Sequence, residues 1–247
     1  MNTAYDLQVV FPADLGKSTS KQIQGTSPTM VVPVGSTEQH GPHLPLDTDT
    51  RIATAVAHAA ATELKASGYS GELLLAPAIP YGASGEHEGF AGTVSIGTEA
   101  LEYVLVQYGR SACNWARRLI FLNGHGGNVE ALHAAVSRLR GEGRDVGWCS
   151  CAASGADAHA GHTETSLMLH ISPETVSTER CVGNVTPLAK LMPQLRRGGV
   201  AEVSEVGVLG DPTTATAGEG AHYFAEMVKR SAECIRRWMP GGDGMLR

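Results

Sequence analysis

Several short segments of this sequence combine histidine with carboxylate residues, and the first of them begins at Glu38. Side chains two apart in an extended segment point the same way, so Glu38 and His40 can converge on one point while Gln39 faces elsewhere. Asp47 and Asp49 follow at the expected start of a helix, from which a carboxylate can reach back to that point. Such a set suits a divalent metal. Alternatively, Glu38 pairs with His40 or with solvent, and an aspartate simply caps the helix.

A glycine-rich segment, residues 123–128, carries another candidate ligand. Its glycines leave the backbone free to bring His125 close to a ligand, and we expect Gly126, Gly127 and Asn128 to contact the substrate. Asn128 is also available to cap the helix expected to begin there. The segment lacks the Lys-Ser/Thr pair of a phosphate-binding loop and the third glycine of a dinucleotide fingerprint. A ligand role and an ordinary hydrogen-bonded loop histidine both stay open for His125.

Residues 157–166 supply two histidines and a carboxylate in a short stretch. His159 or His162 could act as general acid or base, and Glu164 could bind a metal or orient an imidazole. Glu164 would also be favourable in the first turn of a helix without any catalytic role.

A further segment, residues 81–93, is too rich in glycine to form a core. We interpret it as a substrate-contacting loop in which Ser84, Glu86 and His87 lie in or around the cleft. A solvated charged loop is the alternative.

Each of these segments follows a predicted β-strand. The strands are expected at residues 29–34, 72–76, 118–123 and 145–151, and the helices at residues 50–67, 99–116, 129–140, 163–171 and 219–239. Thr98 is a plausible cap for the second helix, and residues 176–217 are expected to form ordered loops with one short hairpin. This alternation predicts a mostly parallel sheet with helices on both faces. Active sites form at the carboxyl edge of such sheets, where scattered structural histidines would not be expected to gather, so the coincidence favours chemistry.

Composition and net charge limit the classes of protein to which this chain can belong. With 247 residues, 42% of them hydrophobic, the chain is long enough for an α/β domain, and we expect residues 1–247 to form a single one. The net charge of −6 and the lack of a Lys/Arg stripe argue against nucleic acid as a partner. No apolar run approaches the roughly 20 residues of a membrane span, and no secretory pattern begins the chain. We therefore expect no membrane partner and a cytoplasmic protein with reduced cysteines.

Three linked motifs carry a resemblance to a known family. They are Ser36-Thr-Glu-Gln-His-Gly-Pro-His-Leu-Pro, Asn123-Gly-His-Gly-Gly-Asn and Asp157-Ala-His-Ala-Gly-His-Thr-Glu-Thr-Ser. In order and spacing they resemble the creatininase (creatinine amidohydrolase) family over about residues 28–235. Within it, the whole chain resembles the creatininase-like peptidases of the mycofactocin maturation system, including residues 46–53, 81–87 and 207–216.

The resemblance implies a three-layer α/β/α sandwich with a mainly parallel sheet, a homo-oligomer that is often a hexamer, and two divalent metal ions per subunit. Zinc, iron and manganese all suit such mixed ligands. Carried over by position, Glu38 and His125 would bind one metal, His40 the other, and Asp49 both, while His159 would move protons. Creatininase itself has a glutamate at the position of Gly127, so here the remaining ligand would come from Glu164 or water.

The implied activity is metal-dependent hydrolysis of an amide bond in a modified ribosomal precursor peptide. The cut would fall ahead of a crosslinked C-terminal Val-Tyr pair and release a small pyrrolidinone-type product. Metal-activated water would make a serine or cysteine nucleophile unnecessary. Three alternatives stay open: a formamide deformylase of flavin or deazaflavin biosynthesis, a creatinine-type cyclic amidohydrolase, and a metal-stabilised scaffold protein of the maturation machinery.

Overall fold

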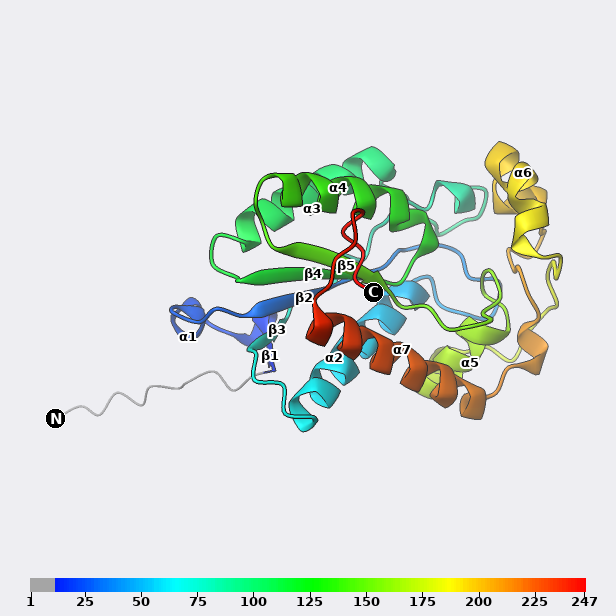
Figure 1. Ribbon diagram of the computed structural model, residues 1–247. Helices are drawn as coiled ribbons and strands as arrows, with labels where there is room; N and C mark the ends of the chain where they lie inside the picture. Colours follow the sequence, from blue (N-terminus) through cyan, green and yellow to red (C-terminus); the bar gives the residue numbers. More distant parts are fainter. Residues whose placement is uncertain (1–11) are drawn as a thin grey trace.

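The computed structural model describes residues 12–247 and is built around a five-stranded parallel sheet of order β1-β3-β2-β4-β5 (Figure 1). The strands are β1 (Ala13–Asp14), β2 (Thr29–Val34), β3 (Leu73–Leu75), β4 (Arg118–Asn123) and β5 (Val146–Ser150). Strands β2 and β4 are paired along their whole length, with Val34 opposite Asn123. The loops that follow these two strands therefore leave the sheet side by side.

Helices cover both faces of the sheet, which confirms the predicted sandwich (Figure 1). One face carries α3 (Thr98–Ala112) and α4 (Val129–Gly141). The other face carries α2 (Thr48–Ala66), α5 (His162–Ile171) and α7 (Ala217–Arg237). A short helix, α1 (Ser20–Ile23), precedes β2, and α6 (Leu188–Gly198) stands apart, beyond the end of the sheet from which the functional loops emerge.

The strands bury both of their faces, as expected for a parallel sheet covered on two sides. Val31, Ile120 and Leu122 pack towards α2, α5 and α7, whereas Met30 and Phe121 pack towards α3 and α4. Each strand thus contributes alternate residues to two large hydrophobic clusters. A much smaller cluster lies outside both of these, and it consists of Leu191, Val200 and Leu209 with Phe90, Leu195 and Val203 packed against it.

The predicted capping residues were wrong in detail. Thr98 is the first residue of α3, and the N-cap position belongs to Gly97, whose φ is 75°. Asn128 occupies the N-cap position of α4, but its side chain makes no capping hydrogen bond, because its amide is engaged elsewhere in the site.

The predicted hairpin within residues 176–217 is also wrong, because this region contains α6 and short 3-10 turns in its place. Leu188, Leu191, Met192 and Leu195 follow helical spacing, and this was the signal for a helix. Pro193 lies inside that helix, where proline usually breaks the hydrogen-bond ladder, so the segment resembles a loop in sequence.

Two further expectations concern the whole chain. The single domain over residues 1–247 stays a prediction, and its first eleven residues lie outside the described part of the chain. Among residues 12–247, no helix has both the length and the apolar character that crossing a bilayer requires.

Candidate metal centre

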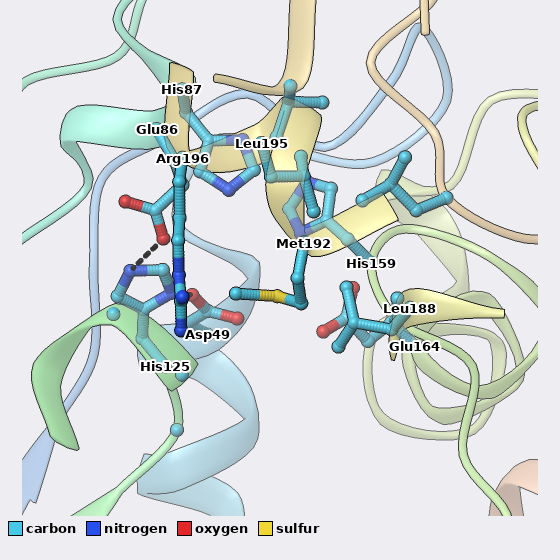
Figure 2. A pocket seen from close by; sticks show the side chains of 16 residues that line it. Asp49, Glu86, His87, His125, His159, Glu164, Leu188, Met192, Leu195 and Arg196 are labelled. Carbon is cyan, nitrogen blue, oxygen red and sulfur yellow. Dashed lines mark ion pairs between the residues drawn. The ribbon is translucent and has the colours of Figure 1, made fainter. Parts of the chain in front are cut away.

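The loops after β2, β3, β4 and β5 converge on one cavity of about 480 Å³ at the carboxyl edge of the sheet (Figure 2). Its polar walls are Asp49, Glu86, His87, His125, His159 and Glu164. Glu38 and His40 lie directly behind these residues and are fully buried. The structure therefore brings together side chains that are more than 120 residues apart in the sequence.

Glu38 is the innermost carboxylate of the site. Neither of its oxygens has a hydrogen-bond partner within residues 12–247. Instead they face imidazoles: Nε2 of His125 at 3.2 Å, Nε2 of His87 at 3.4 Å and Nδ1 of His159 at 3.8 Å. A buried carboxylate without hydrogen bonds is costly unless a cation compensates it, so this arrangement fits a bound metal ion.

Asp49 lies between two imidazoles. Its Oδ1 is 3.2 Å from Nε2 of His40, and its Oδ2 is 3.2 Å from Nδ1 of His125. Ser36 donates its hydroxyl hydrogen bond to Oδ2 at 2.7 Å and so fixes the carboxylate. With both oxygens directed at different imidazoles, Asp49 is placed to be shared between two ligand groups.

Two glycines allow the start of α2 to press against the strand ends. A Cβ on Gly35 would lie 2.6 Å from the Cα of Thr50, and a Cβ on Gly124 would lie 2.6 Å from the backbone oxygen of Asp49. Larger residues at these positions would push α2 outwards, and the carboxylate of Asp49 would move with it.

A second group of potential ligands shares His40. His40, His159 and Glu164 each offer a ligand atom, and these atoms lie within 4.8 Å of one another, as do those of Glu38, His40 and Asp49. Nε2 of His40 is 3.8 Å from Oε2 of Glu164, which also accepts a hydrogen bond from the backbone of Ala160 at 2.6 Å. Mixed imidazole and carboxylate donors suit zinc, iron or manganese.

The charges of the site favour a bound cation. Burial opposes protonation of His40, but Asp49, Glu164 and Glu38 outweigh it and raise its pKa to about 10. Burial likewise opposes ionisation of Asp49, yet His40 and His125 hold its pKa well below the usual value. Asp49 thus remains ionised beside a protonated His40, and a metal ion would take the place of that proton.

The pKa of His159 is shifted in the opposite direction to that of His40. Burial, together with the neighbouring His40 and His87, lowers its pKa well below the usual value. Burial and then Asp49 raise the pKa of Glu164 to about 7, against the influence of His40. His159 is therefore held as a neutral imidazole at neutral pH.

Gln39 is the main residue that sequence analysis missed. Its side-chain amide donates to Nδ1 of His87 at 2.8 Å and to the backbone oxygen of Gly207 at 2.9 Å. Its backbone oxygen accepts a hydrogen bond from Nε2 of His159 at 2.9 Å, which leaves Nδ1 of His159 facing Glu38. The sequence predicted that Gln39 faces elsewhere than Glu38 and His40, but its side chain contacts His87 and His159, the same imidazoles that face Glu38.

Several predicted site residues lie outside the cavity lining. Ser84 and Asn128 are fully buried, and the amide of Asn128 donates to Gly35 and accepts from the backbone of Ala83. Asp47 pairs with Arg51 at 2.7 Å on the surface of α2. His162 points away from the centre towards Glu219, 3.4 Å distant.

Helix α6 supplies an apolar wall that the sequence did not predict. Leu188, Met192 and Leu195 also line the cavity, and in the view of Figure 2 the side chain of Arg196 runs towards Asp49 and His125. The cavity therefore combines a charged floor with an apolar side.

Gly127 offers a sharp test of this packing. A Cβ at this position would lie 2.2 Å from the backbone oxygen of Ala83, 2.4 Å from Nε2 of His125 and 2.8 Å from Oε1 of Glu86. We expect Gly127→Ala to displace His125 and to lower both the metal content per subunit and the activity, the latter by about 100-fold. Gly126→Ala is the matched control for metal content, since its Cβ would meet nothing within 4 Å and would not displace His125. Equal metal content in the two variants would contradict this account.

The buried cluster of carboxylates and imidazoles at the carboxyl edge of the parallel sheet is therefore a candidate centre for divalent metal ions. The creatininase model, described as creatinine amidohydrolase, matches residues 15–235. The chain belongs to the creatininase family, which confirms the resemblance of its three motifs and makes it a hydrolase of amide bonds.

Individual relatives agree with this membership. The "Mycofactocin precursor peptide peptidase" of Mycolicibacterium smegmatis is 62% identical over 247 residues, covering 100% of each chain. The solved structure "Creatininase Mn" is 26% identical, has a TM-score of 0.74 and covers 92% of this chain and 99% of its own. A mutant creatininase of the "Zn-Zn type" has the same identity and TM-score and covers 92% of this chain and 98% of its own.

Proposed function

We propose that this protein is a metal-dependent peptidase that acts on the mycofactocin precursor peptide. It cuts the amide ahead of the crosslinked C-terminal Val-Tyr pair and releases a small pyrrolidinone-type product. The identity of 62% to a peptidase of that name over the full length of both chains supports the substrate. The observation that carries the chemistry is the buried, unpartnered carboxylate of Glu38 among three imidazoles.

Two divalent metal ions, of zinc, iron or manganese, are part of this proposal. Glu38 and His125 would hold one, His40 the other, and Asp49 would bind both, because its two oxygens face different imidazoles. Glu164 would complete the set, since its carboxylate reaches to 3.8 Å from His40. Metal ions bound there would polarise the scissile carbonyl and lower the pKa of water.

His159 moves the proton in this scheme. Its Nε2 is anchored on the backbone of Gln39, so the ring has a fixed orientation with Nδ1 towards the centre. A neutral imidazole held in this way can take a proton and pass it to the leaving amine. Glu86, His87, Gly126 and Gly127 line the cavity and are proposed to contact the substrate, while Ser84 and Asn128 position the loops behind them.

Mass spectrometry of the crosslinked precursor peptide tests the activity. We expect metal-reconstituted protein to release the C-terminal Val-Tyr-derived fragment and the Glu38→Ala variant to release none, because the variant lacks the innermost carboxylate. An intact peptide after incubation with protein of confirmed metal content would overturn the peptidase assignment. Formamides of flavin and deazaflavin biosynthesis and creatinine would then be the next substrates to assay. We further propose that the protein works as a homo-oligomer in the cytoplasm.

A further inference from the structure

A second cavity of about 610 Å³ adjoins the catalytic cavity. Both cavities are lined by Ala158, Leu188 and Leu209, so they lie next to each other on either side of these three residues. We call this second part the side cavity; its other lining residues fall within 156–162, 184–187 and 210–211.

The shared wall is tied directly to the catalytic centre. The backbone nitrogen of Leu209 donates to the oxygen of His159 at 2.8 Å, and the nitrogen of His159 donates back to Leu209 at 3.3 Å. The residues that separate the two cavities are therefore held directly beside His159, which lines the catalytic cavity.

The side cavity is preformed by backbone hydrogen bonds. Gly183 donates to the oxygen of Gly210 at 3.0 Å, and Asn184 donates to that of Val208 at 3.0 Å. The side chain of Asn184 accepts from the nitrogen of Thr186 at 2.9 Å. Residues 183–186 are thus fixed alongside residues 208–210 and form a rigid border.

The chemistry of the border favours a peptide and not a small ion. The carboxylate of Asp157 accepts hydrogen bonds from the backbone nitrogens of His162 and Thr163, and that of Asp211 accepts from Thr213, so both acids are already engaged. The apolar side chains are the ones left open: Val185 is 67% exposed and Leu188 is 44% exposed. Exposed apolar side chains beside an open cleft are typical of binding surfaces.

We propose that the side cavity binds the part of the precursor peptide that precedes the scissile bond, with apolar side chains of the peptide against Val185 and Leu188. This inference rests on the proposed function. A peptidase that cuts close to a C-terminus holds a short fragment on one side of the bond and the remainder of the chain on the other. The side cavity adjoins the catalytic cavity across Ala158, Leu188 and Leu209, and its exposed Val185 and Leu188 offer that remainder an apolar surface next to the metal centre.

The variant Val185→Asp tests this subsite, and Val182→Asp is its matched control. Val182 is also exposed, at 54%, but does not line the side cavity. We expect Val185→Asp to raise KM for the full-length crosslinked precursor about tenfold while kcat is unchanged. A truncated crosslinked peptide that keeps only two residues before the scissile bond does not reach the side cavity. With this substrate, we expect kcat and KM of Val185→Asp to equal those of the unmutated protein. Val182→Asp should leave KM unchanged with either substrate.

A direct binding measurement separates this inference from the proposed function. The probe is a fluorescein-labelled peptide of the precursor sequence that precedes the Val-Tyr pair, and its Kd is measured by fluorescence anisotropy with metal-loaded protein. We expect an about tenfold weaker Kd for Val185→Asp than for Val182→Asp. Cleavage with an unaltered KM and Kd would overturn the subsite alone, whereas binding that depends on Val185 without cleavage would overturn the peptidase activity alone. A change in subunit number for Val185→Asp, seen by light scattering, would assign this face to contact between copies and would also overturn the subsite.

Discussion

Asp49→Ala is expected to abolish turnover and to empty the metal centre. The carboxylate of Asp49 faces His40 and His125 at 3.2 Å each, so its removal takes a shared ligand from both metal-binding groups. We expect kcat to fall by about 1,000-fold or more, which corresponds to a loss of about 4 kcal/mol of transition-state stabilisation. Elemental analysis of the desalted protein should show a parallel fall in bound metal.

Asp47→Ala is the control for this experiment. Asp47 is two residues away, and the residue pattern alone offered it beside Asp49, whereas the family resemblance selected Asp49; in the structure the carboxylate of Asp47 pairs with Arg51 on the surface. Its loss should cost less than about 1 kcal/mol of stability and leave metal content and turnover unchanged. An Asp49→Ala protein that keeps its full metal content would refute the shared-ligand assignment.

His159→Ala should separate proton transfer from metal binding. We expect turnover to drop by about 100-fold to 10,000-fold, the usual contribution of a general acid or base, while metal content stays at the parental level. The reason is geometric: the ring is anchored by Gln39, and its Nδ1 lies 3.8 Å from Glu38, farther away than His125. Turnover and metal content are measured on the same preparation.

His162→Ala is the matched control for this second experiment. His162 belongs to the same motif, yet its ring faces Glu219 and Thr214, away from the centre. His162 lines the side cavity but does not face the metal centre, so its variant should retain kcat and metal content, the two quantities that this experiment compares. If His159→Ala lost metal together with turnover, His159 would be a ligand, as its grouping with Glu38 and His87 also allows.

Much of the fold could be predicted because the signals are local. The apolar runs of β2 and β4 and the helical spacing in α2 and α7 depend only on neighbouring residues. Helix α6 was missed because Pro193 contradicts the helical pattern locally, while the packing of Leu191 against Val200 and Leu209 stabilises the helix from outside.

The candidate site, too, could be predicted only where the signals are local. The two-residue period of an extended segment predicted that Glu38 and His40 lie on one side. The predicted parallel sheet placed the separate motifs at one edge. The position of Gln39 beside His87 and His159 depends on contacts across 48 and 120 residues, which no local pattern contains. The choice between Asp47 and Asp49 likewise depended on how α2 is rotated against the sheet.

The separate anchoring of α6 has an evolutionary consequence. This helix and its neighbours pack in their own small cluster, apart from the two cores that hold the sandwich together. Mutations in α6 can therefore accumulate at little cost to the stability of the domain. The metal centre lies on the strand ends of the sandwich, whereas the apolar wall lies on a separately packed helix. Exchange of residues 183–203 between family members is thus a route by which one hydrolytic centre could acquire new substrates.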